Sequence, residues 1–168
     1  MNTNTKKLVM ASMFAALCCI ATMIIRIPSP LKGYINLGDC MVLLSGFILT
    51  PVYGFLAAGL GSAFADIFSG YVVYAPVTFL VKGIMALVAY FTFKLMKNKA
   101  GNTFSRVIGG IIAEIIMVLG YYVFEGFMYG FVASAINIPA NAVQGVAGII
   151  IGVILAKIFD KGLKNINL

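Results

Sequence analysis

The chain has 168 residues, of which 62% are hydrophobic and only 10% are charged. Soluble domains are about 45–50% apolar and roughly 25% charged, and disordered chains are poorer still in apolar residues, so this composition excludes both classes. The net charge of +7 comes from short basic clusters beside apolar runs. That arrangement indicates membrane topology rather than nucleic-acid binding, which uses basic stripes with interleaved aromatics.

A membrane-spanning helix needs about 20 mostly apolar residues, so the length allows about six spans and short loops. We therefore expect a single six-helix membrane domain over residues 1–168, without room for a separate ATPase or catalytic domain. The first predicted span is 8–27, after Lys6 and Lys7. Its apolar run is longer than that of a signal peptide and no polar mature domain follows, so we interpret it as a membrane helix. Residues 28–38 are predicted to form a polar, turn-rich loop.

The region 40–65 carries no charge but is interrupted at Pro51, which removes a backbone donor and disfavours helix in the residue before it. The sequence thus predicts a short helix over about 39–50 and a second over about 53–69, then a loop over 69–76. The fourth span is 76–95 and the fifth is 105–128, joined by the hydrophilic linker 96–104. A loop over 129–138 leads to the sixth span, 139–159.

Six spans put both termini on one side of the membrane. The positive-inside rule makes that side cytoplasmic, because it holds nine of the 12 basic residues. On the predicted outer side the basic residues are Arg26, at the end of the first span, and Lys32, in the loop 28–38. The nine are Lys6, Lys7, Lys94, Lys97, Lys99, Arg106, Lys157, Lys161 and Lys164.

Three ionisable residues lie well inside predicted spans: Lys82, Glu114 and Glu125. Such residues are costly in a bilayer unless they are paired or face a cavity. Lys82 and Glu125 lie at similar depths, which allows an ion pair between them. The pair either holds two helices together or contacts a polar ligand.

Other polar residues follow helical spacing in the outer halves of the spans. Tyr121 and Glu125 share a stripe with Glu114, and Asn141 and Gln144 share one on the sixth span. Tyrosine and phenylalanine residues gather at the same end. Interhelical hydrogen bonds and an interfacial aromatic belt explain part of this pattern. Their convergence at one depth favours a pocket that opens outward.

Small residues mark faces where helices approach closely. Ala11 and Ala15 form a small-xxx-small pair on the first span. This face serves either internal packing or docking of another membrane subunit.

The chain resembles the S components of energy-coupling factor (ECF) vitamin importers. The resemblance rests on the six spans, the Ala11–Ala15 pair and the segments GYINLGD, LTPVYGFLAAGLGSAFADIFSGY and YAPVTFLVKGIMA within 33–86. It implies a non-catalytic subunit without a cofactor of its own in the bacterial cytoplasmic membrane. That subunit captures a vitamin at the outer face and docks through Ala11 and Ala15 onto a transmembrane coupling subunit. Two cytosolic ATPase subunits then drive delivery. The first outer loop, 28–38, would act as a lid, with Asn36 or Asp39 reaching the ligand.

We therefore expect an all-α membrane protein with six transmembrane helices and cytoplasmic termini. The chain looks most like the S components that take small pyridine or pyrimidine vitamins. We therefore expect pyridoxine, pyridoxal or hydroxymethylpyrimidine as the ligand, with riboflavin as the alternative. Three other functional classes remain open at this point. They are a membrane enzyme that uses Glu114 or Asp66 as a base, a structural subunit without a ligand, and a proton-coupled carrier. The sequence contains no His, and its three Cys lie in or beside apolar runs, so no zinc site is expected. The predicted substrate-binding residues are Asn36, Asp39, Lys82, Tyr121, Glu125, Asn141 and Gln144.

Overall fold

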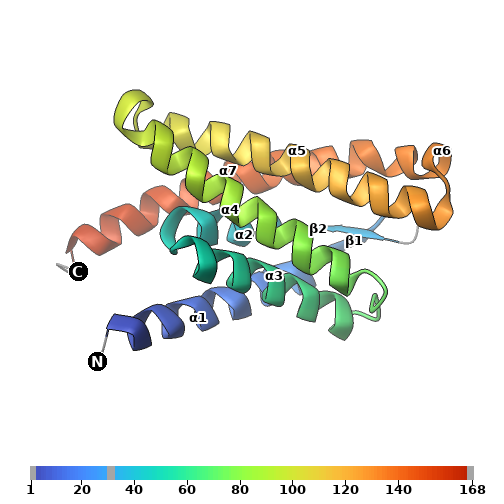
Figure 1. Cartoon of the computed structure of the whole chain (residues 1–168), viewed down its shortest axis with the longest axis horizontal. Helices are drawn as coiled ribbons and strands as arrows, with labels where there is room; N and C mark the ends of the chain where they lie inside the picture. Colours follow the sequence, from blue (N-terminus) through green and yellow to red (C-terminus); the bar gives the residue numbers. More distant parts are fainter. Residues whose placement is uncertain (1–2, 30–32, 166–168) are drawn as a thin grey trace.

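The computed structural model describes residues 3–29 and 33–165, and it is a bundle of long helices with one short hairpin (Figure 1). Within these described residues, five segments are long and apolar enough to cross a membrane. The all-α membrane fold predicted from composition is confirmed. The long helices are α1 (Thr3–Ile24), α3 (Pro51–Phe68), α4 (Ala75–Ala100), α5 (Asn102–Tyr129) and α7 (Ile138–Asn165).

The sixth helix of the predicted count is α2 (Gly38–Ile48), which has 11 residues and is buried along most of its length. At about 1.5 Å per residue it spans roughly half of the hydrocarbon core, so it acts as a shortened second span inside the bundle. The predicted break before Pro51 is confirmed. Leu49 and Thr50 are extended, and Pro51 opens α3 where its missing N–H is not needed.

The segment between α1 and α2 is not only a loop. Strands β1 (Arg26–Pro28) and β2 (Tyr34–Asn36) form an antiparallel hairpin in which Arg26 faces Asn36 and Pro28 faces Tyr34. The polar composition of 28–38 correctly predicted a turn but concealed this pairing, because each strand has only three residues. Lys32, in the predicted outer loop, lies outside the described residues.

Two other predicted loops are helical. Helix α4 continues to Ala100, and Gly101, with φ of 78°, provides the turn into α5. Lysines 97 and 99 favour the last turn of a helix, so the polarity of 96–104 marks the exit from the membrane rather than the end of the helix. The segment predicted as the loop 129–138 contains α6 (Phe131–Ser134) and a 3₁₀ turn, η1 (Ala135–Asn137), after Gly130.

The described termini and the α4–α5 turn lie at one end of the bundle, and the hairpin and α6 lie at the other (Figure 1). Because the basic clusters are at the first end, we call it the cytoplasmic end and the second the outer end. Between them lies an apolar core in which Phe14, Leu43 and Met85 are fully buried.

The small residues of α1 pack against α3 within this bundle. Ala11 is buried in the core, and a Cβ added to Gly61 on α3 would lie 2.3 Å from the Ala15 carbonyl oxygen. The internal-packing interpretation of the Ala11–Ala15 face therefore holds for Ala11. Ala15 remains partly exposed at the rim of an apolar groove between α1 and α3.

Candidate functional site

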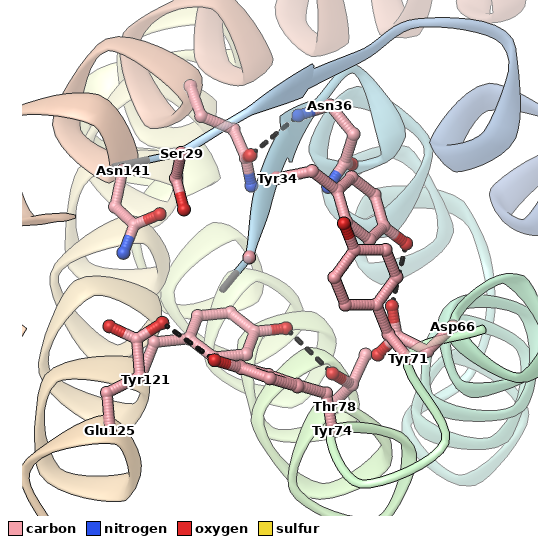
Figure 2. A pocket seen from close by; sticks show the side chains of 12 residues that line it. Ser29, Tyr34, Asn36, Asp66, Tyr71, Tyr74, Thr78, Tyr121, Glu125 and Asn141 are labelled. Carbon is pink, nitrogen blue, oxygen red and sulfur yellow. Dashed lines mark hydrogen bonds between the residues drawn. The ribbon is translucent and has the colours of Figure 1, made fainter. Parts of the chain in front are cut away.

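A polar cavity lies at the outer end, between the hairpin and helices α3, α4, α5 and α7 (Figure 2). Its volume is about 40 Å³. Small-molecule sites typically enclose roughly 300–1,000 Å³, so a ligand must displace the hairpin or some of the lining side chains. The lining residues are Ser29, Gly33, Tyr34, Asn36, Asp66, Tyr71, Tyr74, Thr78, Tyr121, Glu125, Asn141 and Gln144.

The structure brings most of the predicted binding residues together at this cavity. They come from the hairpin, from α5 and from α7, as the helical spacing of the polar stripes indicated. Two predicted residues, Asp39 and Lys82, are not among those that line it. The five that do are Asn36, Tyr121, Glu125, Asn141 and Gln144.

The Lys82–Glu125 pair that the similar depths allow does not form in the structure. Lys82 donates to Asp39, and the side chains of this pair are only 4% and 0% exposed. Asp39 does not belong to the lid but lies in the first turn of α2, which begins inside the bundle. Depth along the helices could not reveal this pairing, because it depends on how far the hairpin carries the chain inward before α2 starts.

The buried pair lies next to the cavity rather than in it. The Lys82 ammonium is 5.5 Å from the centroid of the Tyr121 ring, which lines the cavity. Gln144 donates from Nε2 to the second Asp39 oxygen at 2.6 Å. Asp39 and Lys82 thus neutralise each other, and each contacts a residue that lines the cavity: Asp39 contacts Gln144, and Lys82 contacts Tyr121.

Glu125 has neutral partners instead of a lysine. Asn137, in η1, donates to Glu125 Oε2 at 2.9 Å, and the Tyr74 hydroxyl lies 3.5 Å from Oε1. These contacts position the carboxyl group at the cavity wall without placing a cation beside it. Figure 2 shows Glu125 beside Tyr121 and below Asn141.

The hairpin is fastened to two helices by hydrogen bonds. The Tyr34 hydroxyl donates to Asp66 Oδ1 on α3 at 2.7 Å, and the Asn36 backbone N–H donates to Gln144 Oε1 on α7 at 2.7 Å. Burial first, and then the nearby Asp66 carboxylate, raises the pKa of the Tyr34 phenol, so this group stays protonated and remains the donor. The hairpin therefore closes one side of the cavity through a small number of polar contacts.

Tyrosine rings form much of the remaining wall. The centroids of Tyr34 and Tyr71 are 4.8 Å apart, and those of Tyr71 and Tyr74 are 6.2 Å apart. Tyr121 and Thr78 share a hydrogen bond of 3.0 Å. The sequence assigned Tyr121 to the site, but it placed Tyr34, Tyr71 and Tyr74 only at the outer end, since an interfacial belt has the same composition.

Asp66 is the other site residue that sequence reasoning missed, having considered it only as a possible catalytic base. It is 6% exposed, and its Oδ2 atom has no hydrogen-bond partner among the described residues. Its position near the outer end of a membrane helix was the available signal. The described lining residues thus present carboxyl groups, phenols, other hydroxyls and amides, and none of them carries a cationic side chain. Such a lining suits a flat neutral or cationic ring that carries hydrogen-bond donors.

Within the described part of the chain, no group of three or more His, Cys, Asp or Glu side chains is arranged to hold a metal ion. The arrangement of membrane helices around one polar, aromatic cavity defines a small-molecule-binding membrane protein. The family model described as "ECF-type riboflavin transporter, S component" matches residues 2–161. The chain belongs to this family of ECF-type S components.

Solved and curated relatives agree with this family. A structure described as the S component of a bacterial ECF transporter superposes with a TM-score of 0.77 at 26% identity, covering 96% of this chain and 99% of the other. An uncharacterized Pyrococcus woesei protein is 36% identical over 143 residues, covering 84% of this chain and 93% of that protein. The thiamine precursor transporter HmpT of Lactococcus lactis subsp. cremoris is 23% identical over 171 residues, covering 98% and 94%.

Membership of this family, together with the apolar helices, makes the chain a multi-pass protein of the cytoplasmic membrane. S components are the substrate-binding subunits of ECF transporters and work with an ECF module. The partner kind expected from the sequence is therefore supported, and the resemblance is confirmed at the level of the family.

Proposed function

We propose that this S component captures a small single-ring aromatic vitamin, pyridoxine, pyridoxal or hydroxymethylpyrimidine, in the outer cavity. The observation that carries the proposal is the convergence of hairpin, α3, α4, α5 and α7 side chains around one polar, tyrosine-walled space. Stacking on the tyrosine rings would hold the ring, and Glu125, Asn141 and Gln144 would bind its substituents. Asn36 would act from the hairpin, and Asp39 and Lys82 would act by positioning Gln144 and Tyr121.

The charge of the lining narrows the ligand class. Asp66 and Glu125 both face the cavity, whereas Lys82 is bound to Asp39 outside it. An anionic ligand would meet two carboxyl groups without a compensating cation among the described lining residues, which is unfavourable in a site of low dielectric constant. An amino-substituted or protonated ring would instead donate hydrogen bonds to these oxygens. We therefore expect the free vitamin to bind and its phosphate ester to be rejected.

The size of the cavity favours one ring over the three fused rings and sugar chain of riboflavin. A volume of about 40 Å³ must expand even for a single ring, and every additional ring increases the displacement of the tyrosine wall. The family description names riboflavin, while the distant relative HmpT is named for a thiamine precursor. Riboflavin is therefore retained as the second candidate.

In this proposal the chain is non-catalytic and needs no cofactor, and ATP is hydrolysed by two cytosolic subunits that act through a transmembrane coupling subunit. Docking would use the α1 face. Ala15 lines an apolar groove of about 350 Å³ with Ala16, Cys19 and Phe64, whereas Ala11 is turned into the core. Ala15 would thus contact the partner, and Ala11 would support this face from inside.

Calorimetric titration of the purified chain in detergent tests the ligand. We expect one-to-one binding of pyridoxine or hydroxymethylpyrimidine, with weaker or no binding of riboflavin and of pyridoxal phosphate. Asp66→Asn and Glu125→Gln should each weaken binding about tenfold or more, because each removes a charged acceptor. Asp160→Asn, at the cytoplasmic end, is the matched control and should bind as the wild type does.

Tight binding of riboflavin alone would replace the single-ring ligand with the second candidate. Failure of every vitamin to bind would favour a structural subunit. Product formation by the isolated chain would favour a membrane enzyme, and uptake into vesicles without ATP would favour a carrier that acts alone.

A further inference from the structure

Glu114 differs from every other acidic residue of the chain. The sequence contains five acidic residues, and the other four each have a polar partner: Asp39 has Lys82, Asp66 has Tyr34, Glu125 has Asn137, and Asp160 has Arg106. Glu114 is 5% exposed, and neither of its carboxyl oxygens has a hydrogen-bond partner among the described residues. A buried polar group without a partner is rare and requires an explanation.

The surroundings of Glu114 connect two parts of the molecule. On one side, a Cβ at Gly148 of α7 would lie 3.1 Å from Glu114 Oε1 and 2.8 Å from Asp39 Cβ, so this glycine allows both acids to approach the same point. On the other side, the stem of Glu114 lines an apolar groove of about 310 Å³ between α5 and α7, with Ile115 and Val146 exposed at its rim. Glu114 therefore lies between the Asp39–Lys82 pair and the lipid.

Few charged groups face Glu114. They are Asp39 from α2 and Lys82 from α4, while α7 presents Gly145 and Gly148 at this level. Lys82 is already bound to Asp39, so an ionised Glu114 would be a second anion beside one shared cation. Near the middle of a membrane, an ionised group without its own partner is strongly disfavoured relative to the neutral acid.

We propose that Glu114 is a proton-binding site whose proton preserves the Asp39–Lys82 pair and, through Gln144, the closed position of the hairpin. When Glu114 is neutral, Lys82 belongs to Asp39 alone, and Asp39 holds Gln144, which accepts from the Asn36 N–H. When Glu114 loses its proton, it competes with Asp39 for Lys82, and this chain of contacts loosens. Opening of the hairpin is thereby linked to release of a proton, independently of which vitamin the cavity takes.

Labelling of the full-length chain in lipid nanodiscs with dicyclohexylcarbodiimide tests the proton site. This apolar reagent reacts with a neutral carboxylic acid in the lipid phase. The acid adds across one C=N bond, so that a carboxyl oxygen bonds to carbon and the proton goes to nitrogen. We expect a single adduct at Glu114 by peptide mass spectrometry, decreasing as pH rises. The adduct should be lost in Glu114→Gln and retained in the control Asp160→Asn.

Hydrogen exchange of the hairpin amides tests the coupling without any ligand. At alkaline pH we expect 33–37 to exchange faster in the wild type than in Glu114→Gln, which mimics the neutral acid; at acidic pH the two should match. Absence of an adduct at Glu114 at every pH would overturn the proton site. Equal exchange in both proteins at alkaline pH would overturn its link to the hairpin. Neither result depends on the proposed vitamin.

Discussion

The described residues form two ion pairs, each joining a basic side chain to an aspartate, and the two aspartates have different surroundings. At the cytoplasmic end, Arg106 binds Asp160 through two hydrogen bonds of 2.8 and 2.9 Å, and the Asp160 side chain is 37% exposed. Near the outer cavity, Lys82 and Asp39 are almost completely enclosed. When the first pair breaks, its Asp160 side chain can be hydrated although Arg106 is only 3% exposed, whereas neither side chain of the second pair is accessible to water. The two pairs therefore differ in the exposure of the acid: Asp160 reaches water, whereas Asp39 is enclosed with its cation beside the cavity.

Their neighbours show the same contrast. The Arg106 guanidinium lies 4.8 Å from the Phe93 ring centroid and 5.9 Å from that of Phe47, so its environment is apolar apart from Asp160. Lys82 lies over Tyr121, whose hydroxyl continues the polar contacts into the cavity. The Arg106–Asp160 pair thus packs against apolar rings, whereas the Lys82–Asp39 pair belongs to a polar network that reaches the cavity.

The largest expected effect comes from breaking the enclosed pair. Lys82→Met leaves Asp39 charged, buried and without its cation, which should reduce the free energy of unfolding by about 3–5 kcal/mol. Thermal unfolding in detergent, followed by circular dichroism, measures the loss. The double variant Lys82→Met with Asp39→Asn, which removes both charges, should recover most of the stability. If the single variant is no less stable than Arg106→Met, the contrast between the two pairs is wrong.

A smaller effect is expected at the connection between the pair and the hairpin. Gln144→Leu removes the hydrogen bonds to Asp39 and to the Asn36 N–H, and a hydrogen bond to a charged group contributes about 1.5–3 kcal/mol. Ligand affinity should fall at least about tenfold while the bundle stays folded. Calorimetry combined with circular dichroism separates the two effects. Unchanged affinity in a folded Gln144→Leu protein would show that the hairpin contact does not support the site.

The cytoplasmic pair should tolerate disruption better. Arg106→Met removes a cation–π contact and the ion pair with the partly exposed Asp160. We therefore expect the free energy of unfolding to fall by about 1–2 kcal/mol, without a change in ligand affinity. Because Asp160 is partly exposed, the wild-type contribution should decrease with added salt, and unfolding midpoints at low and high salt measure this. A loss of affinity in this variant would mean that the two ends of the bundle are coupled.

The smallest expected effect concerns the fastening of the hairpin. Tyr34→Phe keeps the ring beside Tyr71 but removes the hydrogen bond to Asp66. We expect this change to reduce the free energy of ligand binding by about 1 kcal/mol. The ligand should dissociate roughly fivefold faster at nearly unchanged stability, as stopped-flow tyrosine fluorescence would show. Slower dissociation would indicate that this bond holds the hairpin away from the ligand.

Much of this architecture was predictable because single helices carry their own signals. Hydrophobic length predicted the spans, Pro51 predicted the break between α2 and α3, and helical spacing brought Tyr121, Glu125 and Gln144 to one cavity. Apart from the two predicted loops that are helical, the errors concern relations between segments. Asp39 was misplaced because three-residue strands leave almost no periodic signal, and its pairing with Lys82 depends on the depth at which α2 begins. Tyr34, Tyr71 and Tyr74 were missed because a membrane belt and a ligand site share these residue types.

Native mass spectrometry of the chain purified from its host membrane tests the central claim most directly. We predict one bound molecule with the mass of a free single-ring vitamin, retained by Asp160→Asn and lost when Tyr121→Ala removes the ring that connects the cavity to the Lys82–Asp39 pair. A molecule retained unchanged by Tyr121→Ala would place the ligand elsewhere and contradict the account.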